Sequence, residues 1–139
     1  MATDGPITGN PGAGGFAPCF PVRDMQAALA HYGQLGFEVM PYTPGMTWAW
    51  ARLGAAELHL FVKDDHDPAT TAAAADLQVE NADELGRVLR ETAADGTSHA
   101  YDTPYGREFV HVDPDNNLMR FVTPTVRTET TATGRASPV

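Results

Sequence analysis

The feature that most constrains the fold of this chain is an internal repeat. The segment Gly36–Val62 aligns with Gly96–Val122 at a constant offset of 60 and without a gap. Thr43-Pro44 then falls on Thr103-Pro104. Upstream of these segments, the match continues at an offset of 57, immediately before a helical pattern in each half. Equal lengths and shared turn residues indicate a duplicated unit.

Each unit is predicted to contain one strand, one helix and three further strands. Asp24 is a good N-cap, and the apolar residues after it recur at i, i+3, i+4 and i+7, which is typical of an amphipathic helix. Asn81 and Glu84 have the spacing of a capping box. In the first unit we expect a helix at Met25–Leu35 and strands at Ala17–Val22, Phe37–Tyr42, Thr47–Leu53 and Glu57–Val62. In the second we expect strands at Asp76–Val79, Ser98–Tyr101, Glu108–Val112 and Leu118–Thr123.

The two ends of the chain differ in composition from the part between them. Residues 1–15 contain five glycines and two prolines, and residues 124–139 are small and polar. Neither segment carries enough apolar surface to offset the entropy of ordering it. The sequence therefore predicts disordered tails at 1–15 and 124–139, a first module at 16–62, a polar linker at 63–73 and a second module at 74–123.

Charge and apolar patterning exclude several classes of function. Nine basic against 18 acidic residues give a net charge of −9, which repels phosphate backbones and argues against nucleic-acid binding. The chain lacks a run of about 18 apolar residues, so we expect no membrane span. The first residues lack the basic and apolar regions of a secretory signal, which predicts a cytoplasmic protein. The single cysteine, Cys19, excludes an internal disulfide, and we expect it to be buried and unreactive.

Two sequence motifs carry a resemblance to a known superfamily. They are PVRDMQAALAHYGQLGFE in the first half and TPYGREFVHVDPDNNLMRFV in the second. With the repeated βαβββ pattern, they resemble the vicinal oxygen chelate superfamily, which includes glyoxalase I, extradiol dioxygenases and bleomycin-resistance proteins. The second motif is most similar to the bleomycin-resistance branch. The resemblance implies an α+β fold in which two βαβββ modules form a curved mixed sheet with a cleft. It also implies a homodimer whose ligand lies between subunits.

The resemblance further locates the positions where metal-dependent relatives place their ligands. Counted from the helix caps and from the DP turn, with the offset of 60, these positions are Ala17, Leu60, Ala74 and Arg120. Methyl groups have no lone pair and guanidinium stays protonated, so we expect no metal and no other cofactor. On the same count, alternation along the strand turns His59 away from the cleft, towards a helix. The remaining histidines are interpreted as structural or solvated.

Without a metal, a cleft of this kind acts through shape, stacking and charge. Tyr105 is the predicted stacking residue, and Gly106 beside it is expected to let a planar ligand approach the backbone. Glu108 is expected to meet a cationic group. Arg120 is expected either to donate hydrogen bonds to a ligand or to pair with Glu108. The other candidates are aromatic or apolar side chains that either line the cleft or fill the core: Trp48, Trp50, Phe37, Tyr42 and Met46.

These expectations together predict a metal-independent drug-binding protein rather than an enzyme. It would sequester a DNA-damaging antibiotic and so confer resistance, as the resemblance implies. The expected ligands are a bleomycin-like glycopeptide, or a planar aromatic compound such as an anthraquinone-type enediyne or a mitomycin. The alternatives are a glyoxalase-like or dioxygenase-like enzyme of the same fold and a module that binds a metabolite.

Overall fold

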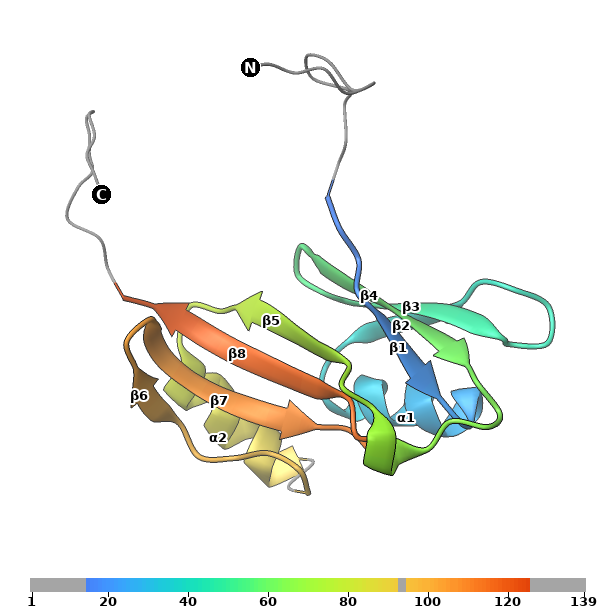
Figure 1. Ribbon diagram of the computed structural model, residues 1–139. Coiled ribbons are helices and arrows are strands. Elements are labelled where there is room, and N and C mark those ends of the chain that lie inside the picture. Colours follow the sequence, from blue (N-terminus) through green and yellow to red (C-terminus); the bar gives the residue numbers. More distant parts are fainter. Residues whose placement is uncertain (1–14, 93–94, 126–139) are drawn as a thin grey trace, which may run out of the picture.

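The computed structural model describes residues 15–92 and 95–125, which form two βαβββ modules (Figure 1). Most of the predicted tails therefore lie outside the described residues. The first module consists of β1 (Cys19–Val22), α1 (Met25–Gln34), β2 (Glu38–Pro41), β3 (Trp48–Leu53) and β4 (Ala56–Val62). A short 3-10 helix, η1 (Pro68–Thr70), lies in the connection. The second module consists of β5 (Ala74–Gln78), α2 (Ala82–Thr92), β6 (Tyr101–Thr103), β7 (Gly106–Val112) and β8 (Leu118–Pro124).

The helices begin where the sequence places their caps. The Asp24 carboxylate accepts a hydrogen bond from the Ala27 backbone N–H, and the Asn81 side chain accepts one from the Glu84 N–H. The second half of the expected capping box is absent, because the Glu84 carboxylate binds Arg87 instead of reaching back to the cap. Gly36 follows α1 with a φ of 97°, a left-handed conformation that glycine adopts without strain.

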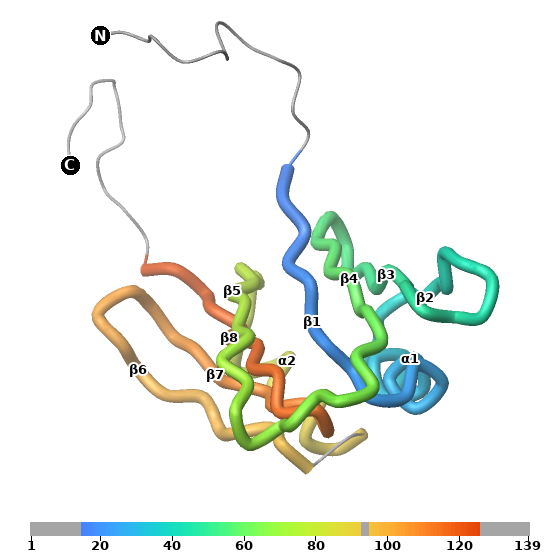
Figure 2. Tube along the Cα trace, turned by 45° about the vertical axis from the view of Figure 1, so that its right-hand side comes forward, coloured from blue at the N-terminus to red at the C-terminus, as the bar shows by residue number. Residues whose placement is uncertain are grey.

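In the described residues, the strands form two four-stranded mixed sheets in the orders β1-β4-β3-β2 and β5-β8-β7-β6. In each sheet the first strand of the module runs parallel to the last, and the other pairs are antiparallel. β1 and β5 lie at the adjacent edges of the two sheets, and the helices lie on the same side of them (Figures 1 and 2). The predicted α+β class with two βαβββ modules is confirmed.

Alternating residues of each sheet pack against its helix. In the first module Phe20, Ala49 and Leu60 are fully buried on this face, together with Tyr32 from α1. In the second module the rings of Phe109 and Phe121 stack with centroids 4.6 Å apart. This packing leaves the opposite face of each sheet free of its own helix.

The structural equivalence of the modules differs by one residue from the gapless alignment. β3 and β7 keep the offset of 60, because Trp50 pairs with His59 as Val110 pairs with Arg120. The same pairs make Arg120 the repeat equivalent of His59, which corresponds to an offset of 61. The turn between β7 and β8 is longer than the one between β3 and β4, and a slip of one residue turns every side chain to the other face. The assignment of Leu60 to the ligand position was therefore wrong: Leu60 is buried in the core.

β6 also begins later than predicted. Ser98–Tyr101 was expected as a strand, but the ladder to β7 starts at Tyr101. Before it, the Ser98 hydroxyl accepts the Val110 N–H, and Ser98 donates its own N–H to the Val110 carbonyl. A side chain thus takes the place of a backbone acceptor, and the regular ladder is interrupted there.

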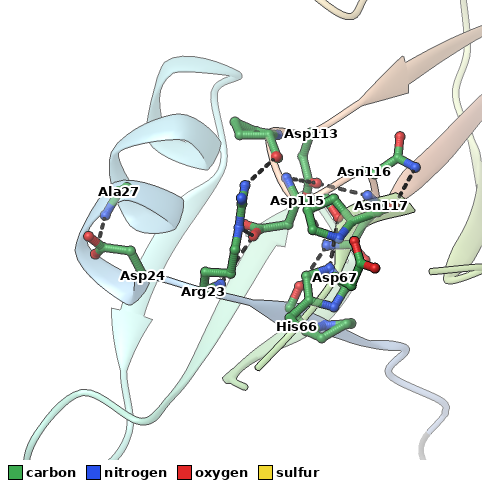
Figure 3. Close-up of polar contacts among 12 residues, drawn as sticks. Arg23, Asp24, Ala27, His66, Asp67, Asp113, Asp115, Asn116 and Asn117 are labelled. Carbon is green, nitrogen blue, oxygen red and sulfur yellow. Dashed lines mark hydrogen bonds and ion pairs between the residues drawn. The ribbon is translucent and has the colours of Figure 1, made fainter. Parts of the chain in front are cut away.

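A buried carboxylate, Asp113, lies in the turn between β7 and β8 and joins the two modules. Figure 3 shows this turn with Arg23 and His66 beside it. Asp113 Oδ1 accepts the backbone N–H groups of Asp115 and Asn117, each at 2.9 Å. Its Oδ2 accepts the Tyr32 hydroxyl of α1 at 2.6 Å and the Asn117 amide at 3.0 Å. Burial raises the pKa of Tyr32 well above its usual value, and the Asp113 charge adds to this effect. The tyrosine is therefore a neutral donor at physiological pH.

Further contacts tie the first module to the same turn. Arg23 Nε donates to Asp115 Oδ1 at 2.7 Å, and Asn117 Nδ2 donates to the Pro21 carbonyl at 3.0 Å. His66 Nε2 donates to the Asp115 carbonyl at 2.9 Å. His66 lies in the predicted polar linker and was expected to be structural or solvated; it is a buried residue of the junction.

Asp113→Ala should lower the free energy of unfolding by about 3 kcal/mol, because the substitution strands several buried donors. Urea denaturation followed by circular dichroism measures the change. Asp64→Ala, which removes an exposed carboxylate from the connection, is the control and should change stability by less than about 0.5 kcal/mol. Equal stabilities of the two variants would contradict the role given to Asp113.

Candidate functional site

The sheet faces that point away from the helices carry the candidate site. The face of the first sheet opposite α1, here called the aromatic face, is formed by Cys19, Pro21, Trp48, Trp50, His59 and Phe61. The face of the second sheet opposite α2, here called the charged face, is formed by Asp76, Tyr101, Glu108, Val110, Arg120 and Val122. The predicted ligand-binding residues that lie on the sheets are divided between these two faces.

The two tryptophans lie on the aromatic face and not among the residues that pack beneath α1. The Trp48 ring stacks on Phe61, with centroids 5.5 Å apart and planes at 24°. The Arg52 guanidinium lies 3.7 Å from the centroid of the Trp50 ring, and Trp50 is only 8% exposed. Tyr42, which is half exposed, meets the edge of His59. Trp48 and Tyr42 are therefore more accessible to a ligand than Trp50.

His59 belongs to a short chain of polar contacts on this face. The Glu57 carboxylate accepts hydrogen bonds from His59 Nε2 and from Arg52 Nε, both at 2.7 Å. The bond from His59, followed by the one from Arg52, lowers the pKa of Glu57. The expectation that His59 packs against a helix was wrong, because the register turns it to the aromatic face.

The charged face holds a buried acid beside an ion pair. Glu108 is 9% exposed, and its Oε2 accepts the Tyr101 hydroxyl at 2.7 Å. This hydrogen bond, with a smaller effect of burial, raises the pKa of Tyr101. Arg120 Nε donates to Asp76 Oδ1 at 2.6 Å, so the expected alternative of an Arg120–Glu108 pair was wrong. Among the described residues, Glu108 has no ion-pair partner.

A hollow of about 570 Å³ lies between the modules, and one of about 510 Å³ lies over the charged face. The second hollow is lined by Asp76, Gln78, Tyr105, Glu108, Arg120 and Val122 among others. Tyr105 stands at its rim and is 79% exposed. The second hollow therefore combines an exposed aromatic ring with a buried carboxylate.

Three predicted site residues contact other parts of the protein itself. A Cβ at Gly106, where φ is 151°, would lie 2.2 Å from the Thr123 carbonyl oxygen, so the close approach at this glycine is to β8. Phe37 is buried and meets the Tyr32 ring edge-on at 5.5 Å. Met46 packs against the core of its module. Phe37 also borders the hollow between the modules.

Several residues of the two faces were not predicted as site residues. Tyr101 was the last residue of the predicted strand Ser98–Tyr101 but was given no role in the site, and His59 and Phe61 were missed because of the shift in β4. Allowance for the longer turn in the second hairpin would have found the latter two. Cys19 was expected to be buried, but it is exposed.

The donor set does not fit a resident metal ion. With the register corrected, the four positions at which metal-dependent relatives hold their ligands are Ala17, His59, Ala74 and Arg120. Only His59 has a lone pair to offer, and Glu57 already binds its Nε2. Across residues 15–92 and 95–125, no three His, Cys, Asp or Glu side chains gather at one point.

Solved structures with this fold include several proteins that bind antibiotics. No protein-family profile and no curated protein matches the chain. A bleomycin-binding protein from bleomycin-producing Streptomyces verticillus, complexed with copper(II)-bleomycin, has a TM-score of 0.68 and 23% identity, covering 80% of this chain and 96% of its own. An antibiotic-binding protein from Streptomyces sp. CB03234 has a TM-score of 0.57 and 22% identity, covering 81% and 98%.

A glyoxylase/bleomycin resistance protein/dioxygenase domain from Frankia sp. EAN1pec has a TM-score of 0.65 and 18% identity, covering 81% and 98%. At these identities the likeness shows the fold alone, which this chain shares with bleomycin-binding proteins and a glyoxylase/bleomycin resistance protein/dioxygenase domain. The predicted fold is confirmed, and the closer resemblance to the bleomycin-resistance branch stays a prediction. Neither helix in the described part of the chain is long and apolar enough to cross a membrane.

The donor set predicts that the chain retains no transition metal. After incubation with excess Zn²⁺, Mn²⁺ or Fe²⁺ and gel filtration, the untagged protein should carry far less than one ion per chain. Elemental analysis of the eluted protein measures this ratio. One ion per chain, lost in His59→Ala, would show that a metal binds on the aromatic face.

Proposed function

We propose that this chain is a metal-independent binding protein for an aromatic, cationic antibiotic, which it sequesters without chemical turnover. The observation that carries the proposal is the combination of the two faces: partly exposed aromatic rings on one sheet and, on the other, a buried carboxylate that has no ion-pair partner in the described part of the chain. The antibiotic-binding proteins that share the fold support this assignment.

Stacking and burial supply the affinity in this proposal. Each aromatic stack contributes about 0.5–1.5 kcal/mol beyond the burial of its area. With two or three stacks and several hundred Å² of apolar surface at roughly 25 cal/mol per Å², a micromolar or tighter dissociation constant is within reach. Binding of that strength is sufficient to sequester a toxic compound.

Charge selects the ligand class. The protein carries a net charge of −9, and Glu108 presents its carboxylate beside the hollow over the charged face. The Tyr101 hydrogen bond fixes the orientation of that carboxylate. A ligand that places an ammonium or amidinium group there gains a charge-assisted hydrogen bond. Bleomycin-like glycopeptides and cationic planar aromatic compounds meet this requirement.

A homodimer would complete the site. The hollow over the charged face is lined only by second-module residues, and Trp48 and Tyr42 do not border it. In the proposed dimer, the aromatic face of one copy covers the charged face of the other, so that one ligand contacts both. The resemblance to the bleomycin-resistance branch supports this arrangement.

Tryptophan fluorescence tests the proposed function directly. Titration with metal-free bleomycin, mitomycin C and an anthraquinone-type enediyne should quench the emission with a micromolar or lower dissociation constant for at least one compound. Tyr105→Ala should weaken the binding of that compound at least tenfold and leave the melting temperature of the protein nearly unchanged. Val88→Ala removes an exposed apolar side chain from α2, away from both hollows, and is the control. Unchanged emission with all three compounds would overturn the proposed ligand class.

Glu108→Gln tests the role of charge separately. The amide still accepts the Tyr101 hydroxyl but carries no charge, so the variant should bind a cationic compound about tenfold more weakly, the loss of one charge-assisted bond. A neutral compound of similar shape should bind equally to both proteins. Isothermal titration at two salt concentrations measures these affinities. Equal losses for both compounds would show that Glu108 supports the fold of the site rather than the ligand charge.

A further inference from the structure

Two histidines meet head to head across the junction of the modules. His31 lies on α1 of the first module and His111 on β7 of the second, and their Nε2 atoms are 2.8 Å apart. The ring centroids are 5.0 Å apart and the planes differ by 24°. A centroid distance so much longer than the contact distance means that the rings meet at their edges, with the two nitrogens pointing at one another.

This geometry requires one proton between the two nitrogens. Two lone pairs at 2.8 Å would repel, and two N–H groups would clash, so one imidazole donates and the other accepts. A shared metal ion does not fit, because two nitrogens opposed across zinc, at about 2.0 Å each, would be about 4 Å apart. His111 Nδ1 is held by the Thr97 hydroxyl at 2.7 Å, which fixes the orientation of its ring.

The pair tolerates one added proton but not two. An imidazolium can still donate to a neutral imidazole, so a first proton leaves the hydrogen bond in place. A second proton sets two N–H groups and two positive charges against each other. His111 has no exposed surface, so solvent cannot offset this repulsion.

The groups around the pair act on the two histidines differently. Asp113 and Asp115 of the β7–β8 turn favour the charged form of His31, but burial outweighs them and lowers its pKa. Burial, with the charge of His31 as a smaller effect, lowers the pKa of His111 to about 4. The neighbouring Tyr32 and Arg23 bind Asp113 and Asp115 respectively. Asp95 lines the hollow of about 580 Å³ beside His31.

We propose that His31 and His111 form an acid-sensitive clamp between the modules. At neutral pH the shared proton holds α1 against β7, and as the pH falls the second proton releases this contact. The clamp adjoins the Asp113–Tyr32 bond, so its release loosens the junction that orients the aromatic and charged faces. This inference goes beyond the proposed function, since it concerns the free protein and needs no ligand.

The sign of the effect follows from proton linkage. A histidine whose pKa is lowered in the folded state binds its proton more readily when the chain is unfolded, so stability falls as the pH drops below about 6.5. Each such histidine raises the unfolding constant about tenfold per pH unit, down to its folded-state pKa. For His111 this amounts to about fifteenfold between pH 6.5 and pH 5, because half of the unfolded chains already carry the proton at pH 6.5.

Urea denaturation of the full chain at pH 7, 6.5, 6, 5.5 and 5 tests the clamp. The comparison uses His31→Gln, His111→Gln and the double variant, because glutamine can keep one hydrogen bond at the junction but does not titrate. The wild-type unfolding constant should rise at least about fifteenfold between pH 6.5 and pH 5, and the double variant should lose this change. His99→Gln, which replaces an exposed histidine outside the junction, should keep the wild-type profile.

A second measurement covers the case in which His111→Gln fails to fold. Proton NMR of the His111 ring follows its titration in the wild type and in His31→Gln. Removal of the His31 charge should raise the pKa of His111 above its wild-type value of about 4. The clamp is ruled out if the double variant keeps the wild-type pH profile, or if His111 titrates identically with and without His31.

Discussion

The arrangement of this molecule depends on the hydrogen bonds that one buried carboxylate accepts. Asp113 binds two backbone N–H groups of its own turn, so it defines the local conformation, and it binds the Tyr32 hydroxyl of the other module, so it defines the junction. Both roles require an acceptor with two oxygens and several lone pairs, which an aspartate supplies in a small volume. Because α1 is held at this turn, the aromatic and charged faces keep a fixed relation within one chain.

The two sheets are equivalent in topology, but their open faces differ in chemistry. The row Trp50, His59 and Cys19 of the first module corresponds to the row Val110, Arg120 and Asp76 of the second. The position equivalent to a metal ligand holds a histidine in one row and an arginine in the other, and each of these side chains binds a carboxylate. The hydrogen-bond donors of His59 and Arg120 are thus already used within the protein. What remains for a ligand is aromatic surface on one face and Glu108 on the other.

Much of the fold could be predicted from the sequence because its signals are local. Caps such as Asp24, the apolar period of the helices and the turn residues depend on neighbours in the chain, and the helices and most strands lie close to their expected positions. The site was harder to predict because it depends on register. A shift of one residue between the equivalent positions of β4 and β8 exchanged Leu60 for His59, and the pairing of Tyr101 with Glu108 became visible only in the ladder between β6 and β7. Gly106 was interpreted as a position where a ligand can approach the backbone, because the sequence does not show that the Thr123 carbonyl lies against it.

The separation of the junction from the open faces has a consequence for how binding can respond to pH. His31 and His111 lie on the helix side of the structure, whereas the residues proposed to contact a ligand lie on the opposite sides of the sheets. Protonation of the pair therefore acts on a ligand through the relative position of the modules. A ligand that touches only the charged face would be insensitive to the clamp, because that face belongs to one module. A ligand that contacts both faces within the proposed dimer would be sensitive. Its site would combine a first module with a second module, so it would depend on the relative orientation of the modules within each chain. The acid response of binding thus reports how many modules a ligand spans.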